Sequence, residues 1–166
     1  IYAIPTFHNP TGYSYSGSKR REMLELAEKY NCFIIEDNYV SELDFKGGNF
    51  LPLKSQDKNS RVIFIKSFSK IFMPVLRLGF MIVPQNLRSN ILEAKHATDI
   101  STSGLIQRAF DIYIRKGYWD RHFKFMYDIY KERYYKSIKL LDECLPDGVY
   151  YRKPGGGLNI WLNMPY

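Results

Sequence analysis

The stretch from Ile63 to Gly79 constrains the fold most, because it joins an apolar run to a group of polar side chains. It opens with Ile-Phe-Ile, which is typical of a buried strand. Ser67, Ser69 and Lys70 follow, and Arg77 comes seven residues after the lysine. Ligands of α/β sheets bind beyond the carboxyl ends of strands. Hydroxyls and a guanidinium can hold a phosphate, and a shielded lysine can be an amine nucleophile. A solvated lysine at a strand end is the alternative.

Length and composition exclude several classes. The chain has 166 residues, of which 45% are hydrophobic, so it can bury a core of about one domain. The formal charge is +7, but no run of five like charges marks a nucleic-acid arm. Cys32, Cys144 and the three histidines lack metal-ligand spacing, so no metal site is expected. We find no signal peptide and no long apolar span, and therefore expect a cytoplasmic protein without a membrane partner.

The order of the expected elements predicts an α/β fold. Segment 16–30 has the spacing of an amphipathic helix that Ser16 or Ser18 can cap. The expected strands cover residues 1–4, 32–35, 63–65 and 80–83. Strand, helix, strand, loop, strand is the order of a three-layer α/β/α sheet that is mainly parallel.

Three further polar residues are candidates for a ligand site. Asn9 lies in a loop rich in proline and glycine, where its amide can bind a ligand oxygen or simply start a turn. Asp37 and Tyr39 follow the apolar run at 32–35, and period-two geometry places them on the same side. The alternative makes Asp37 a helix cap and Tyr39 a packing residue.

The second half of the chain is mainly helical in pattern. Helices are expected over 87–97, from a cap at 101–103 to near Gly117, and over 119–145. Two strands, 149–151 and 158–162, then flank Pro154-Gly155-Gly156-Gly157. The triple glycine has no Lys-Ser/Thr after it, so it is not a P-loop.

Taken together, Asn9-Pro10-Thr11-Gly12, Asp37-x-Tyr39 and Ser67-x-Ser69-Lys70 with Arg77 resemble the fold-type-I pyridoxal-phosphate enzymes of the class I/II aminotransferase group. The resemblance covers essentially the whole chain. It implies that residues 1–118 are the C-terminal part of the large, cofactor-binding domain. Residues 119–145 would be a long interdomain helix, and 146–166 the beginning of a small α+β domain. Because the chain opens and closes abruptly beside apparent strands, we expect a piece of a longer protein.

The resemblance also implies roles for single residues around pyridoxal 5'-phosphate. Lys70 would form the Schiff base and then shuttle a proton, and Asp37 would hold the proton of the ring nitrogen. Tyr39 and Asn9 would bond the phenolic oxygen of the ring. The phosphate would be bound by Ser67, Ser69 and Arg77. The family's glycine-rich loop, ring-stacking aromatic and carboxylate-binding arginine find no match in this chain.

Three functions remain open within the resemblance. The first is the sensing domain of a MocR-type regulator of the GntR class, which the sequence Asp37-Asn38-Tyr39 favours because many free-standing enzymes have proline at the middle position. The second is a free-standing aminotransferase acting on an amino acid and a 2-oxo acid, which Asn9 favours. The third, a structural fragment without cofactor, describes this isolated piece better than the whole protein. The parent is expected to be a homodimer that binds an amino acid, 2-oxo acid or amine. It would contact DNA only through a winged-helix domain outside this chain. The parent is expected to carry the chemistry, and the fragment alone to be inactive.

Overall fold

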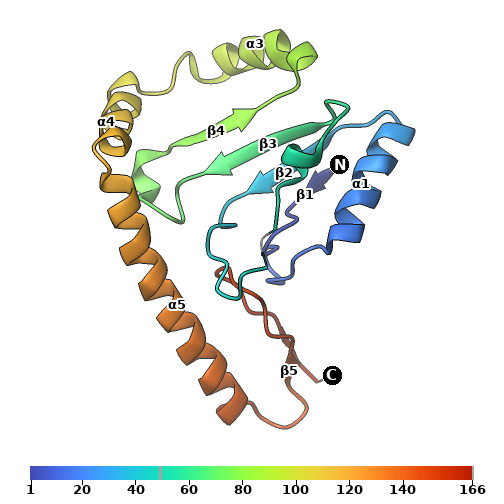
Figure 1. Cartoon of the computed structure of the whole chain (residues 1–166), viewed down its shortest axis with the longest axis vertical. Coiled ribbons are helices and arrows are strands. Elements are labelled where there is room, and N and C mark those ends of the chain that lie inside the picture. The colour runs from blue at the N-terminus through green and yellow to red at the C-terminus, as the bar shows by residue number, and fades with distance from the viewer. Residues whose placement is uncertain (49, 166) are drawn as a thin grey trace.

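The computed structural model describes residues 1–48 and 50–165. Its centre is a four-stranded sheet in which the strands lie in chain order (Figure 1). The strands are β1 (Tyr2–Ala3), β2 (Ile34–Asn38), β3 (Val62–Ser67) and β4 (Gly79–Ile82). The first three run parallel, and β4 is antiparallel to β3. The predicted α/β fold with a mainly parallel sheet is therefore confirmed, and β2 begins two residues later than the apolar run suggested.

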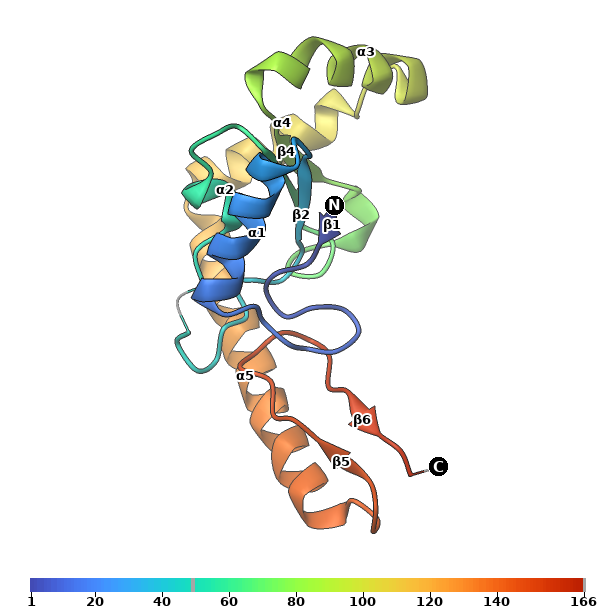
Figure 2. The same cartoon turned by 90° about the vertical axis from the view of Figure 1, so that its right-hand side faces the viewer.

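Buried and half-buried positions alternate along β2 and β3, as the period of a strand requires. One face of these strands carries the buried side chains of Ile34, Glu36, Asn38, Val62, Phe64 and Lys66. Helices α1 (Gly17–Lys29) and α2 (Leu53–Gln56) lie on one side of the sheet (Figure 2). Their Ala27 and Leu53 are buried in one core with Ala3. The opposite face is thereby left for Asp37 and Ser67.

Two local interactions explain where the covering helices begin. The hydroxyl of Ser16 accepts a hydrogen bond from the amide of Lys19 at 3.2 Å, which confirms the predicted cap of α1. The short α2 begins at the buried carboxylate of Glu36, which accepts from the amides of Leu53 and Lys54 at 2.9 and 2.8 Å. Burial raises the pKa of the Glu36 carboxyl, and these two amide hydrogen bonds oppose the shift.

The helices of the second half occur where their periodicity predicted them. They are α3 (Arg88–Asp99), α4 (Gly104–Arg115) and α5 (Tyr118–Cys144), and two 3-10 turns, η1 (Pro74–Leu76) and η2 (Gln85–Leu87), flank β4. Helix α5 runs away from the sheet (Figure 1). Its buried Met126, Tyr134 and Ile138 form a second core with Phe7, Val40, Leu43, Phe45 and Ile71. This core joins α5 to the loops that leave β1 and β2.

The C-terminal segment differs from its prediction. Strands β5 (Tyr150–Tyr151) and β6 (Leu162–Asn163) form a short antiparallel pair, so most of the strand expected over 158–162 is wrong. The triple glycine that precedes this segment packs against the loop after β2, where Gly156 forms an isolated antiparallel bridge with Asp44. A Cβ on Gly156 would lie 2.8 Å from the ring of Phe7 and would also collide with the carbonyl oxygen of Leu43. The glycines thus permit close packing.

Among residues 1–48 and 50–165, we find no helix with the combination of length and hydrophobicity that crossing a bilayer requires.

Candidate functional site

The carboxyl ends of β2 and β3 bring several predicted residues together. Asp37 pairs with Ile65, and Ser67 lies two residues further along β3. Because side chains on a strand alternate between faces, Asp37 and Ser67 lie on the same face of the sheet. Ser67 pairs in turn with Gly79 of β4. A Cβ on Gly79 would lie 2.5 Å from the carbonyl oxygen of Lys66, so only glycine lets β4 approach β3 here.

The turn between β3 and β4 presents the two cations. The amide of Ser69 donates to the hydroxyl of Ser67 at 3.3 Å, and Phe68 bonds the carbonyl of Leu78 at 3.2 Å. These contacts keep residues 67–69 beside the segment that contains Arg77. Lys70 and Arg77 are both exposed, so the expected shielding of the lysine is wrong for this chain and the alternative of a solvated lysine matches. No carboxylate among the described residues pairs with either cation.

The backbone of Arg77 is strained. Its φ of 51° lies in the left-handed region, at the end of the turn η1. A non-glycine residue there costs about 1–3 kcal/mol, and such residues cluster at ligand sites. Phe7, Asn31, Ser60 and Ile100 share this backbone region, so the phosphate-binding role of Arg77 stays a prediction.

Asp37 has one engaged and one free carboxylate oxygen. The hydroxyl of Tyr2, from the neighbouring strand β1, donates to Oδ2 of Asp37 at 2.5 Å. The hydrogen bond to the carboxylate, together with burial, raises the pKa of Tyr2 to about 12, so this hydroxyl keeps its proton at neutral pH. Within the described residues, Oδ1 of Asp37 has no hydrogen-bond partner. That oxygen can accept a hydrogen bond from a protonated nitrogen.

Tyr39 links β2 to the loop of Asn9. Its hydroxyl donates to the carbonyl oxygen of Phe7 at 2.8 Å and accepts from the side-chain amide of Asn159 at 2.9 Å. Burial raises the pKa of Tyr39, the hydrogen bond from Asn159 opposes the shift, and the charge of Asp37 adds to it. Asn9 lies two residues beyond Phe7 and is exposed. The contact therefore brings the Asn9 loop to the end of β2.

An ion pair between a buried lysine and a half-buried glutamate lies on the covered face of the same strand ends. The ammonium of Lys66 contacts both carboxylate oxygens of Glu42, at 2.5 and 2.6 Å, and the side-chain oxygen of Asn38 at 3.1 Å. Ser41 donates to the same oxygen of Asn38 at 2.7 Å. Burial lowers the pKa of Lys66, while the charge and the hydrogen bond of Glu42 oppose that shift. The pair anchors the turn that carries Tyr39.

Sequence reasoning missed four of these residues: Tyr2, Glu42, Lys66 and Asn159. A signal existed for Lys66, since it continues the alternation of buried positions from Val62 and Phe64. No local signal existed for Asn159, which meets Tyr39 across 120 residues of sequence.

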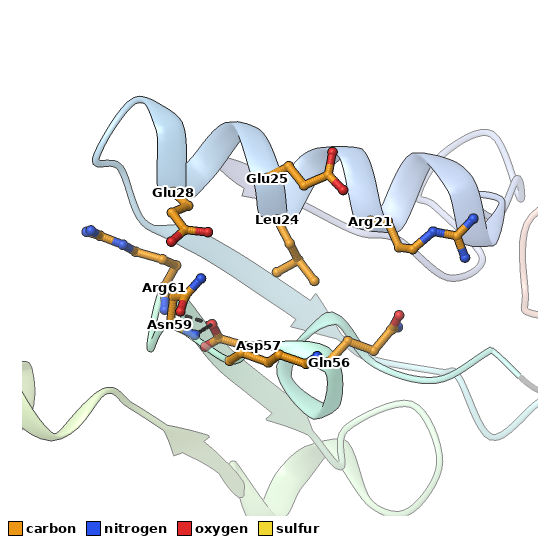
Figure 3. A pocket seen from close by; sticks show the side chains of 9 residues that line it. Arg21, Leu24, Glu25, Glu28, Gln56, Asp57, Asn59 and Arg61 are labelled. Atoms are coloured by element: carbon orange, nitrogen blue, oxygen red, sulfur yellow. Dashed lines mark hydrogen bonds between the residues drawn. The ribbon is translucent and has the colours of Figure 1, made fainter.

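A separate cavity of about 410 Å³ lies between α1 and the segment that leads into β3 (Figure 3). Arg21, Glu25 and Glu28 of the helix face Asp57 and Arg61 across it, so its wall carries charges of both signs. None of the predicted site residues lines this cavity. The cavity is therefore separate from the predicted site at the strand ends.

Solved structures identify the class of protein. Kynurenine aminotransferase of Pyrococcus horikoshii, solved in complex with PMP, superposes with a TM-score of 0.95 at 34% identity, covering 100% of this chain and 41% of that one. The fold is therefore that of the fold-type-I aminotransferases. The chain belongs to the aminotransferase class I and II family, whose model matches residues 3–165.

Curated relatives include both enzymes and regulators. Aromatic-amino-acid aminotransferase 1 of Thermococcus litoralis is 36% identical over 165 residues, which are 99% of this chain and 40% of that protein. The uncharacterized HTH-type transcriptional regulator YisV of Bacillus subtilis is 33% identical over 162 residues, which are 98% of this chain and 34% of that protein. The chain thus spans about two fifths or less of the length of these relatives. Two solved neighbours hold pyridoxal compounds: the P. horikoshii enzyme was solved with PMP, and LysN of Thermus thermophilus with N-(5'-phosphopyridoxyl)-L-leucine.

Proposed function

We propose that the ends of β2 and β3 bind pyridoxal 5'-phosphate. The observation that carries this proposal is a grouping of two cations, for which residues 1–48 and 50–165 offer no acidic partner, beside the hydroxyls of Ser67 and Ser69. Next to them, Asp37 keeps one carboxylate oxygen free while Tyr2 binds the other. Cations, hydroxyls and a free carboxylate oxygen are what a phosphate and a protonated ring nitrogen require. The residues of this chain therefore fit the cofactor.

Each residue then has a defined task. The bound cofactor supplies an electron sink for carbanions. Arg77 and the two serines would hold its phosphate, and Oδ1 of Asp37 would hold the proton of the ring nitrogen. Tyr39 and Asn9 would bond the phenolic oxygen. Lys70 would supply the amine for attachment and act as the general acid and base.

For the whole protein we propose a regulator of the MocR type, in which residues 1–118 and 146–166 belong to a large and a small domain joined by α5. The similarity to HTH-type transcriptional regulators supports this proposal. So does Asn38, whose oxygen accepts from Ser41 and Lys66, a contact that a proline at this position would lack. Such a protein would be a cytoplasmic homodimer that senses an amino acid or amine and binds DNA through a separate domain.

A free-standing aminotransferase is the second candidate for the whole protein. The 36% identity to an aromatic-amino-acid aminotransferase favours it, as does the presence of Asn9. The two candidates share the cofactor site and differ in what the rest of the protein does. DNA binding that changes with an added amine would support the regulator. Steady transfer of amino groups to a 2-oxo acid, without DNA binding, would contradict it.

Covalent attachment at Lys70 tests the cofactor site itself. The full-length protein is incubated with pyridoxal phosphate, reduced with borohydride and digested, and the modified peptide is located by mass spectrometry. We expect the label on Lys70 and its loss in Lys70→Ala. Lys58→Ala is the control, because Lys58 is equally exposed but lies at the separate cavity. A label that survives in Lys70→Ala would refute the assignment.

A further inference from the structure

The hydroxyl of Tyr39 connects three segments that are distant in sequence. It donates to the carbonyl of Phe7, and the side-chain nitrogen of Asn159 donates to it. A tyrosine hydroxyl has a single proton, which here is given to Phe7. The Asn159 atom that faces this hydroxyl must therefore be a hydrogen-bond donor. In the side-chain amide of Asn159, that atom is the nitrogen. We call these contacts the Tyr39 link.

Asn159 is held in place from two sides. A Cβ on Gly12 would collide with the backbone oxygen of Asn159, so the Asn9 loop packs directly against this residue. A Cβ on Gly157 would lie 2.6 Å from the Cβ of Phe7, so the preceding turn is packed just as closely. The backbone of residues 155–157, which we call the glycine turn, thus positions Asn159, the donor of the Tyr39 link. The side chain of Asn159 is half-buried.

We propose that Asn159 is a positioning residue, which acts through Tyr39 on the phenolic oxygen of the bound cofactor. The inference rests on the proposed function, because it assumes that Tyr39 contacts this oxygen. Contact with the phenolic oxygen requires that the single Tyr39 proton turn from the carbonyl of Phe7 to that oxygen. Donation from Asn159 leaves this proton free to turn, polarises the Tyr39 hydroxyl and makes it a stronger donor to an oxygen anion. It also ties the orientation of that hydroxyl to residues 155–160.

The charges around Tyr39 predict the sign of the effect. Asp37 is the carboxylate whose charge raises the pKa of Tyr39, and Tyr2 is the titratable side chain that interacts with both. Asn159 opposes Asp37, because its donated hydrogen bond favours the tyrosinate. Removal of the donor should therefore raise the pKa of Tyr39 further.

The test uses full-length protein in which the tyrosine ring carbon bonded to oxygen is labelled with ¹³C, and Tyr39→Phe assigns the signal. The variants are Asn159→Ala and Asn159→Asp, which replaces the donor by an acceptor. Asn163→Ala is the matched control, since within the described part of the chain the Asn163 side chain donates to the carbonyl of Tyr150, at 3.3 Å, and not to Tyr39. Without cofactor, we expect a raised pKa of Tyr39 in both Asn159 variants and no change in the control. With pyridoxal phosphate, we expect about fivefold weaker binding in Asn159→Ala, the size of one ordinary hydrogen bond.

The outcomes separate this inference from the proposed function. An unchanged pKa of Tyr39 in Asn159→Ala would overturn the inference. A raised pKa with unchanged cofactor binding and unchanged cofactor absorbance would overturn it too, while the proposed function would stand. If the unaltered protein binds no pyridoxal phosphate at all, the proposed function fails and the cofactor role of Asn159 fails with it. In a protein that already carries Tyr39→Phe, the added change Asn159→Ala should leave the affinity for pyridoxal phosphate unchanged.

Discussion

The ion pair of Lys66 and Glu42 should respond unequally to the removal of its two members. The side chain of Lys66 is 6% exposed, whereas that of Glu42 is 32% exposed. Glu42→Gln would leave a buried ammonium with neutral oxygens as its partners. Lys66→Met would leave a carboxylate that water can already reach. The burial of the partner that remains decides the cost in each case.

The different burial of Lys66 and Glu42 sets the expected loss of unfolding free energy in each variant. Breaking a buried pair costs about 3–5 kcal/mol, and because a glutamine oxygen can still accept a hydrogen bond, we expect about 2–3 kcal/mol for Glu42→Gln. For Lys66→Met we expect about 1 kcal/mol, the scale of partly exposed pairs. The double variant should be more stable than Glu42→Gln alone, because no buried charge is left.

The cost of Glu42→Gln should also depend on pH. Burial already lowers the pKa of Lys66 in the folded protein, and loss of Glu42 removes the largest opposing effect. Between the lowered folded value and the unfolded value of about 10.4, the unfolded state binds more protons. Stability of the variant therefore rises with pH in this window, as the buried amine becomes neutral. The full loss of stability in Glu42→Gln is seen at pH values below this window.

Thermal unfolding from pH 7 to 10 measures the order of stabilities. It is carried out on the full-length protein, on Glu42→Gln, on Lys66→Met and on the double variant. Glu132→Gln is the control, because the pair of Glu132 and Lys136 has a similar distance, 2.6 Å, but both side chains are exposed. We expect no measurable change there. The reasoning is refuted if Lys66→Met is the less stable single variant, or if the cost of Glu42→Gln grows with pH.

Two further predictions concern Asp37 and the glycine turn. Asp37→Asn should slow amino-group transfer to the bound cofactor at least ~100-fold, or about 2.7 kcal/mol, followed by cofactor absorbance in stopped flow. Near-normal rates would mean that another group protonates the ring. Gly156→Ala should lower the unfolding temperature, because its Cβ meets Leu43 and Phe7, whereas Gly17→Ala, which meets nothing within 4 Å, should not. Equal stability of these two variants would contradict the packing role of the glycine turn.

Local patterns determined the elements and the candidate residues. The cap at Ser16 and the long helix α5 follow from side-chain preferences and from the 3.6-residue period, which act within a few residues of sequence. The resemblance that places Asp37 and Lys70 at strand ends rests on motifs of the same short range. The family and the fold are confirmed, while the tasks of single residues and the division into domains stay predictions.

The tertiary structure decided which of these residues meet. Tyr2 reaches Asp37 because β1 pairs with β2 in one register, and a shift of one residue would turn Tyr2 to the other face. Asn159 reaches Tyr39 because the glycines before it let backbone pack on Phe7. Such contacts depend on strand register and on close packing between distant segments. The hydrophobic periodicity of a short segment determines neither the strand register nor this packing. Both form only when segments distant in sequence come together in the folded chain.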